Sequence, residues 1–308
     1  MLFRSVEPNA PADIALPDAV RNATERVTTD KVAEGVWFVA GGSHNSVAIE
    51  MKDHMVLVEA PLGDVRTGPA LEAVAKLAPG KPIRFVVNSH HHFDHTGGIR
   101  AAASTGATIV TNAANTGGRL RRFNGIDAQP LYHPPPVADR LREGTYGDYV
   151  LVVARLEPLK RVALAIDAMA LVPPPTRLVV VGDGSLSGAL RERAAALGLG
   201  PGRIEFVGAV WGYRVVDLYA DALAVVYTPF DEDYGYVTLE AFLAGKPVVT
   251  ATDSGGPLEF VVHDSTGIVC APDSASVGAA ITSLASDRDR AARLGRAGRA
   301  RAEAITWD

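Results

Sequence analysis

The sequence predicts an α/β protein whose two parts follow different patterns of strands and helices. From Tyr149 onward, apolar segments such as YVLVVA and RLVVVG alternate with amphipathic segments such as RVALAIDAMAL. Continuous Val, Leu and Ile strands, each followed by a helix, indicate a parallel sheet that is covered on both faces. These observations predict a Rossmann-like, doubly wound parallel sheet in the C-terminal part.

The N-terminal part predicts a smaller, strand-rich half-domain. Three short apolar segments between residues 35 and 59, VWFVAGG, NSVAIEM and HMVLVEA, are separated by turn-formers or a charged pair. This spacing is typical of a meander or hairpin. A helix over residues 66–78, the buried strand IRFVVNS and a second helical stretch after Asp94 are expected to follow. The order predicts a partial α/β layer.

The boundary between the two parts is expected near Thr116. Residues 112–148 are rich in turn-forming residues and contain three consecutive prolines, which the interior of a helix does not accept. The predicted domains are therefore residues 1–116 and residues 117–308.

Composition narrows the classes of partner. The chain has 308 residues, 47% of them hydrophobic, and a formal net charge of -5. It has no long run of Lys and Arg to follow a phosphate backbone, so a nucleic acid is not an expected partner. The first 20 residues contain Glu, Asp and three prolines where a secretion signal needs an apolar run. No segment has the length of a membrane span, and a soluble cytoplasmic protein is expected.

Two glutamates flank a predicted anion site in the segment DEDYGYVTLEAFLAGKPVV. Glu232 and Glu240 are eight positions apart, Gly235 lies between them, and a helix is expected to begin near Tyr236. A glycine at such a junction lets the backbone approach a ligand, and the first amides of a helix are unpaired donors for a phosphate. Glu240, one turn inside the helix, can accept hydrogen bonds from a ribose diol. Glu232, in the preceding loop, can take the hydroxyls of a sugar.

Two cations and two glycine-containing loops are predicted at the same edge of the sheet. Arg155 follows the strand YVLVVA, and Lys160 comes five residues later. Cations at the carboxyl end of a parallel strand can neutralise a diphosphate leaving group. One further loop, at Gly182 and Asp183, follows the next strand, and another follows at Gly208. Each of these residues taken singly is an ordinary surface charge or turn glycine.

Taken together, in order, the motifs resemble the family 4 retaining glycosyltransferases of the two-lobed GT-B type. The resemblance rests on R-L-E-P-L-K, V-G-D-G, the glutamate pair, G-K-P-V-V and D-S-G-G-P-L-E-F, and it covers about residues 117–308. It implies a donor lobe that binds a nucleoside-diphosphate sugar without a cofactor. The implied roles are pyrophosphate binding for Arg155 and Lys160, hexose binding and catalysis for Glu232, ribose binding for Glu240, and further donor contacts for Gly182, Asp183, Gly208, Gly235, Tyr236 and Val237.

A second motif, NSHHHFDHTGG, follows a buried strand in the N-terminal part. It places His90, His92, Asp94 and His95 in the pattern H-x-H-x-D-H. Alternate histidines on an extended loop can converge on one metal ion while the last two residues reach a second, and such ligands suit zinc. With GGSHNSVAIE and LVEAP, about residues 20–115 resemble the metallo-β-lactamase superfamily. In that superfamily a second half adds further ligands, and no later histidine lies in a matching context. An incomplete zinc site is expected.

The two resemblances predict the first half of one enzyme joined to the second half of another. The expected function is retaining transfer of a hexose from a nucleoside-diphosphate sugar. Transfer is expected to be impaired because the donor lobe has no acceptor lobe to close against, so water is not excluded from the site. The alternatives are a zinc hydrolase with an incomplete site and a non-catalytic binding protein, whose open sheet edges homo-oligomerisation would cover.

Overall fold

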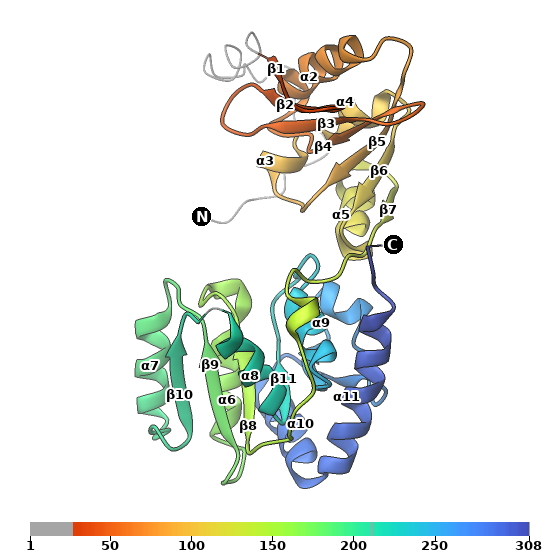
Figure 1. Cartoon of the computed structure of the whole chain (residues 1–308). Coiled ribbons are helices and arrows are strands. Elements are labelled where there is room, and N and C mark those ends of the chain that lie inside the picture. The colour runs from red at the N-terminus through yellow and green to blue at the C-terminus, as the bar shows by residue number, and fades with distance from the viewer. Residues whose placement is uncertain (1–26, 211, 308) are drawn as a thin grey trace. The chain divides into compact units, whose positions relative to one another are not determined.

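The computed structural model describes residues 27–210 and 212–307, and the chain divides into two compact units, residues 1–131 and residues 132–308 (Figure 1). The boundary expected near Thr116 falls inside helix α5 (Ala114–Asn124), which with strand β7 (Ala128–Pro130) extends the first sheet. Because residues 112–148 are rich in turn-forming residues, their composition does not predict this last helix and strand. The N-terminal stretch in which no secretion signal is expected lies outside the described residues.

The first unit contains a seven-stranded mixed sheet in the order β1-β2-β3-β4-β5-β6-β7. Strands β1 to β4 pair antiparallel, and β4 to β7 pair parallel, so the predicted meander and the partial α/β layer are both confirmed. Its other elements are β1 (Thr28–Ala33), β2 (Val36–Ala40), β3 (Ser46–Glu50), β4 (Met55–Val58), α2 (Asp64–Leu77), β5 (Ile83–Asn88), α3 (Phe93–Thr96), α4 (Ile99–Ser104) and β6 (Thr108–Thr111).

The core of the first unit forms because alternate strand residues face the helices. Leu57 of β4 pairs in register with Val86 of β5, and both side chains are fully buried. Val74 of α2 and Ile99 of α4 pack into the same cluster. The loops before β3, after β4 and after β5 lie at the same edge of this sheet. The reason is that β3 starts beside the end of its antiparallel neighbour β4, and β4 and β5 end together.

The second unit contains a six-stranded, entirely parallel sheet in the order β10-β9-β8-β11-β12-β13, which confirms the predicted doubly wound fold. Among the described residues of the chain, no helix has the length and apolar character needed to cross a membrane. The elements are η2 (Ala138–Arg140), β8 (Tyr149–Val153), η3 (Pro158–Lys160), α6 (Val162–Met169), β9 (Arg177–Val181), α7 (Ser187–Ala196), β10 (Ile204–Gly208), α8 (Tyr213–Asp221), β11 (Ala224–Val226), α9 (Tyr236–Leu243), β12 (Val248–Ala251), η4 (Gly256–Glu259), β13 (Gly267–Cys270), α10 (Ser274–Ser286) and α11 (Arg288–Glu303).

The strands of the second sheet are covered on both faces. Every residue of β11 and of β12 is buried, as the continuous apolar segments predict. Helices α6, α7, α10 and α11 contribute to one apolar cluster with β8 and β9. This rigid sheet fixes the carboxyl ends of its strands, from which the loops of the predicted donor site begin.

A buried cation lies in the turn between α9 and β12. Lys246 has no exposed surface, its Nζ donates a hydrogen bond of 2.6 Å to the carbonyl oxygen of Thr145, and it lies 3.9 Å from the ring centroid of Tyr146. Burial lowers the pKa of Lys246 to about 8, although Asp221 and Glu143 oppose that change. The charged form is therefore less stable in the folded chain than in the unfolded chain.

The free energy of unfolding is expected to rise with pH between about 8 and 10.4 because of Lys246. In this window the unfolded lysine still binds a proton that the folded one has released, and the full shift corresponds to roughly 3 kcal/mol. Urea unfolding at pH 7.5 and at pH 9.5 measures the effect, and Lys246→Met is the matched control. If the wild type gains no more stability with pH than Lys246→Met does, the lysine is not titrating in this window.

Candidate functional site

The topology of the second unit defines where a ligand can bind. Strands β8, β9 and β10 follow one another outward, and the chain then returns to place β11 on the other side of β8. The loops after β8 and β11 therefore diverge at the point where the strand order reverses. Open α/β sheets bind their ligands outside the carboxyl ends of the strands at this switch point.

Two of the predicted donor residues meet at the switch point. Lys160, at the end of the loop after β8, forms an ion pair with Glu232, in the loop after β11, and their side chains are only 18% and 21% exposed. Tyr227 donates a hydrogen bond to Glu232, and burial, followed by the charge of Glu232, raises the Tyr227 pKa well above its usual value. Arg155 follows β8 with an exposed side chain. The arrangement places a cation and a carboxylate together at the switch point, where a charged ligand can replace either partner of the ion pair.

The second glutamate lies one turn inside α9, as expected. The Tyr219 hydroxyl of α8 donates a hydrogen bond of 2.7 Å to Glu240 Oε2. Burial raises the pKa of Glu240, and the hydrogen bond from Tyr219 partly offsets that rise. Tyr219 is itself buried, so its single hydroxyl fixes the orientation of this carboxylate. No sequence motif points to Tyr219, which lies 21 residues earlier on another helix.

Glycine is required at two of the predicted positions. Gly235, the residue before α9, has φ of 79°, and a Cβ atom there would lie 3.0 Å from Tyr227 Cε1 and from Pro257 Cγ. Gly182, after β9, has φ of 128°, and its Cβ would lie 1.8 Å from the carbonyl oxygen of Ala154. Both positions adopt conformations that residues with side chains rarely take. They allow the loops to pack closely around the switch point.

Two other predicted contacts have structural partners in their own loops. The Asp183 carboxylate accepts hydrogen bonds from the Gly184 N–H, at 2.8 Å, and from the Ser187 hydroxyl. The Ser187 hydroxyl and then the Gly184 amide lower the pKa of Asp183. Gly208 ends β10, and its carbonyl oxygen accepts a hydrogen bond of 2.9 Å from the N–H of Gly182. These bonds fix the loops after β9 and β10.

Tyr236 and Val237 begin helix α9, and His133 lies against Tyr236. The Tyr236 hydroxyl lies 2.9 Å from His133 Nδ1, and the Tyr234 hydroxyl donates a bond of 2.6 Å to the His133 carbonyl oxygen. The His133 ring stacks on Trp307 with centroids 5.8 Å apart. Burial lowers the pKa of His133, so the neutral imidazole is favoured. Aromatic rings thus gather beside the predicted phosphate-binding amides.

One arginine that the sequence did not single out joins three loops of the site. Arg161 donates two hydrogen bonds to Asp253, of 2.8 and 2.6 Å, and others to the carbonyl oxygens of Thr228 and Pro229. Its backbone is left-handed, with φ of 48°. Arg161 adjoins Lys160, and its acceptors come from the loops after β11 and β12. It therefore holds the loop that carries Lys160 against the loop that carries Glu232.

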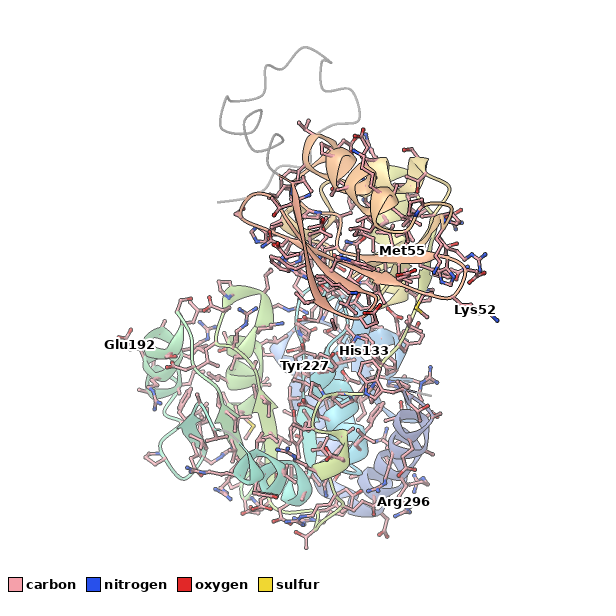
Figure 2. The ribbon with its side chains drawn as sticks, turned by 45° about the horizontal axis from the view of Figure 1, so that its top comes forward. Lys52, Met55, His133, Glu192, Tyr227 and Arg296 are labelled. Carbon is pink, nitrogen blue, oxygen red and sulfur yellow. The ribbon has the colours of Figure 1, made fainter. Side chains whose placement is uncertain are left out.

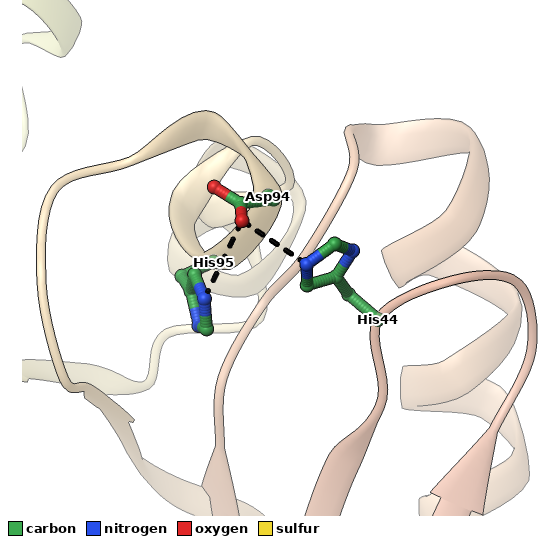
Figure 3. A group of neighbouring side chains, drawn as sticks. All are labelled: His44, Asp94 and His95. Carbon is green, nitrogen blue, oxygen red and sulfur yellow. Dashed lines mark ion pairs between the residues drawn. The ribbon is translucent and has the colours of Figure 1, made fainter. Parts of the chain in front are cut away.

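In the first unit, a different set of residues converges from the one that the histidine motif predicts. Figure 3 shows His44, from the loop between β2 and β3, beside Asp94 and His95 of α3. Asp94 Oδ2 lies 3.0 Å from His44 Nε2 and 3.6 Å from His95 Nε2. One ligand atom from each of the three residues lies within 4.8 Å of the others, so the group could bind a metal ion.

The remaining motif histidines lie close by but are outside this group. The rings of His90 and His95 have centroids 4.0 Å apart, and those of His90 and His92 lie 4.8 Å apart at an interplanar angle of 83°. Among the described residues, His44, Asp94 and His95 are the one group of three whose ligand atoms lie close enough together to hold a metal ion. The two-metal division of the motif therefore remains a prediction, and His44 is a candidate that the sequence reasoning missed.

Comparison with known families assigns the second unit. The model of the family described as "Glycosyl transferases group 1" matches residues 139–301, just over half of the chain. The chain belongs to the group 1 glycosyl transferases. The glycosyl transferase match begins just ahead of β8 and ends in α11, so it covers every loop of the switch-point site. The resemblance expected for the C-terminal part is confirmed.

Curated glycosyl transferases match more than half of the chain. The chain is 32% identical over 224 residues to the D-inositol 3-phosphate glycosyltransferase of Nocardia farcinica, covering 65% of this chain and 49% of the relative. It is 36% identical over 185 residues to the glycogen synthase of Mycobacterium tuberculosis, covering 58% and 42%. The chain thus spans about half or less of the length of these relatives.

A second family model matches a segment that begins in the first unit. The metallo-beta-lactamase superfamily model matches residues 39–204, again just over half of the chain, and its first part includes the histidine motif. The chain therefore also belongs to that superfamily, as expected for its N-terminal part. Residues 139–204 are matched by both models and lie within the second unit.

Solved structures of glycosyl transferases have a similar fold. The chain matches the crystal structure of HepE from Anabaena, determined in complex with UDP and glucose, with a TM-score of 0.64 and 24% identity. The match covers 78% of this chain and 72% of HepE. At this identity the likeness supports the architecture, and what this chain binds must be argued from its own residues.

Proposed function

We propose that the second unit binds a nucleoside-diphosphate sugar at the switch point and holds it for retaining transfer of the hexose. The Lys160–Glu232 ion pair carries the proposal, because it joins the loops after β8 and β11 where an open α/β sheet binds its ligand. A mostly buried ion pair costs desolvation energy, and a ligand that supplies an anion to one partner and hydroxyls to the other can replace it.

The proposed roles follow from these contacts. The diphosphate takes the ammonium group of Lys160, with the first amides of α9 and Arg155 adding positive charge. Glu232, released from Lys160, accepts hydrogen bonds from the sugar hydroxyls. Glu240, oriented by Tyr219, accepts hydrogen bonds from the ribose diol. When the bond from the anomeric carbon to the distal phosphate oxygen breaks, its electron pair goes to the diphosphate, which the same cations stabilise. The oxygen of an acceptor hydroxyl forms the new bond to the anomeric carbon, and the hydroxyl proton passes to the departing diphosphate.

Turnover is proposed to be slow even when the donor is bound. The described part of the first unit is a mixed sheet with a metallo-beta-lactamase pattern, so the described residues supply a single Rossmann-like parallel sheet. Transfer needs donor and acceptor to be held in attack geometry with water excluded. Binding with little or no transfer is therefore expected of the purified chain. A chain that binds the donor and transfers nothing is a non-catalytic binding protein.

Calorimetric titration of the metal-analysed chain with UDP, GDP and ADP is expected to give saturable binding of one of the three. UDP is the first choice, because HepE, a structural neighbour, was crystallised with it. Incubation of the same protein with the corresponding nucleoside-diphosphate sugars then measures released nucleotide. Absence of binding to all three would refute the donor site, whereas rapid transfer would refute only the proposal of slow turnover.

A further inference from the structure

Helix α11 concentrates positive charge on a chain that is acidic as a whole. Six of its 16 residues are arginines and two are carboxylates, whereas the full sequence has 30 Lys and Arg against 35 Asp and Glu. The excess of arginine therefore belongs to this one surface element and does not follow from the composition of the chain.

The packing of α11 on the second unit uses the opposite side of the helix. The buried residues of the helix are small or apolar: Ala291, Leu294, Gly295, Gly298 and Ala302. This side contacts α9 and α10, and Arg299 Nη1 donates a bond of 3.1 Å to the carbonyl oxygen of Leu243 at the end of α9. The helix is thus held on the unit without the arginines of its outward face.

Two of the six arginines are neutralised by carboxylates. Arg290 forms an ion pair with Asp264. Arg299 pairs with Glu143 at 3.3 Å and with Glu303 at 2.7 Å. Among the described residues, no carboxylate lies within ion-pair distance of the other four, which are Arg288, Arg293, Arg296 and Arg301.

The middle of the outward face carries arginine and alanine. Arg293 and Arg296 are exposed and lie three positions apart, so their side chains are neighbours on one face of the helix. Figure 2 shows Arg296 at the outer side of the unit, away from Tyr227. Ala297 and Ala300 are exposed beside them. Such small neighbours let a flat surface come close to the helix, and the long arginine stems can lie along it.

An exposed aliphatic side chain borders this face. Arg301 Nη2 donates a bond of 2.7 Å to the carbonyl oxygen of Glu259, and Arg290 pairs with Asp264. The segment between these two contacts therefore runs beside α11. Val262, in that segment, is 44% exposed. Arginines next to exposed apolar surface are typical of a helix that lies in the plane of a membrane surface.

We propose that the outward face of α11 binds the headgroups of anionic phospholipids, with the helix lying along the membrane surface. At 1.5 Å per residue the helix is roughly 24 Å long, so its arginines can contact more than one headgroup at once. Each arginine near an anionic leaflet raises the affinity about five-fold. The proposal goes beyond the donor site and does not rest on nucleotide binding.

A nucleic acid is the other polyanion that a basic face can meet, and α11 lacks the side chains that such binding uses. Sites for single strands place aromatic rings between their cations, and the bases stack on these rings. Helix α11 contains no aromatic residue. The exposed positions beside Arg296 hold alanine, which offers a base neither a stacking surface nor a hydrogen bond. A lipid surface needs only the positive charge.

Co-sedimentation of the full chain with vesicles tests the proposal. The wild type should sediment with vesicles of equal parts phosphatidylglycerol and phosphatidylcholine but not with phosphatidylcholine alone, and added salt should weaken the binding. Arg293→Gln combined with Arg296→Gln should lower the affinity about 25-fold, which is about five-fold for each charge removed. The control pair, Arg191→Gln with Arg214→Gln, removes the same charge from exposed positions on α7 and α8 and should bind as the wild type does.

Three results would overturn the proposal: no sedimentation with phosphatidylglycerol vesicles, equal binding to phosphatidylcholine alone, or an equal loss in the control pair. Tighter binding to polyuridylic acid than to the vesicles, lost with the α11 arginines, would identify a nucleic-acid face and overturn it too. Circular dichroism and thermal unfolding identify any loss that comes from misfolding. Neither pair of variants lies in the donor site, so nucleotide titration of the same proteins reports on the proposed function separately.

Discussion

Replacing Glu240 by alanine is expected to weaken nucleoside-diphosphate binding about 10- to 100-fold. Hydrogen bonds to a charged group are worth roughly 1.5–3 kcal/mol each, and every 1.4 kcal/mol corresponds to a factor of ten. Glu240 is largely buried and already oriented by the Tyr219 hydroxyl, so little of that energy is spent on ordering the carboxylate. Calorimetric titration with the nucleotide that binds the wild type measures the loss.

Three matched variants separate a binding role from a structural one. Glu240→Gln keeps an acceptor for Tyr219 but removes the charge, so it should retain the fold and still lose most of the affinity. Tyr219→Phe should cause a smaller loss, because only the orientation of the carboxylate is affected. Glu192 lies on the outer helix α7, away from Tyr227 (Figure 2), and Glu192→Ala should bind normally. Wild-type affinity in Glu240→Gln would refute the role of the carboxylate.

The pH dependence of binding gives an independent check. Burial raises the pKa of Glu240, so protonation begins at a higher pH than for an exposed glutamate. Nucleotide affinity of the wild type should therefore fall as the pH is lowered through this raised pKa. Glu240→Gln cannot titrate at this position, and its affinity should vary less over the same interval.

The sequence predicted the parallel sheet well because its strands are buried on both faces. Segments such as YVLVVA and RLVVVG carry the burial pattern in their own composition, and the order of strands and helices then determines a doubly wound sheet. The sequence did not predict the ion pair between Lys160 and Glu232, but it did place both residues in loops that follow parallel strands. Information of this kind is local, and a single sequence contains it.

The parts that could not be predicted depend on contacts between distant segments. Tyr219 reaches Glu240 from another helix, and His44 reaches Asp94 from across the first sheet. A lone histidine in the segment GGSHNS gives no sign that the antiparallel pairing of β3 will bring it to the end of β5. Its place beside the motif residues follows from strand register, which the composition of one loop does not determine.

Arg161 illustrates the same limit and leads to the second large expected effect. Lys160 and Arg161 are adjacent cations, and the motif that singles out Lys160 gives no sign that Arg161 joins three loops. Arg161→Ala is expected to lower the free energy of unfolding by about 2–3 kcal/mol, because it leaves Asp253 and two loop carbonyl oxygens without their guanidinium partner. Nucleotide affinity should fall with it, as the loops that carry Lys160 and Glu232 are no longer joined.

A double-mutant cycle with Asp253→Ala measures the coupling that this arrangement implies. Arg161 and Asp253 form two parallel hydrogen bonds, and Arg161 also lowers the pKa of Asp253, so the two losses should not add. Arg161→Lys keeps the charge but not the paired bonds and should fall between the wild type and Arg161→Ala. Denaturant unfolding gives the coupling energy and calorimetry gives the affinity. Strictly additive losses in stability, with affinity unchanged in Arg161→Ala, would show that the loops keep Lys160 and Glu232 in place without this arginine.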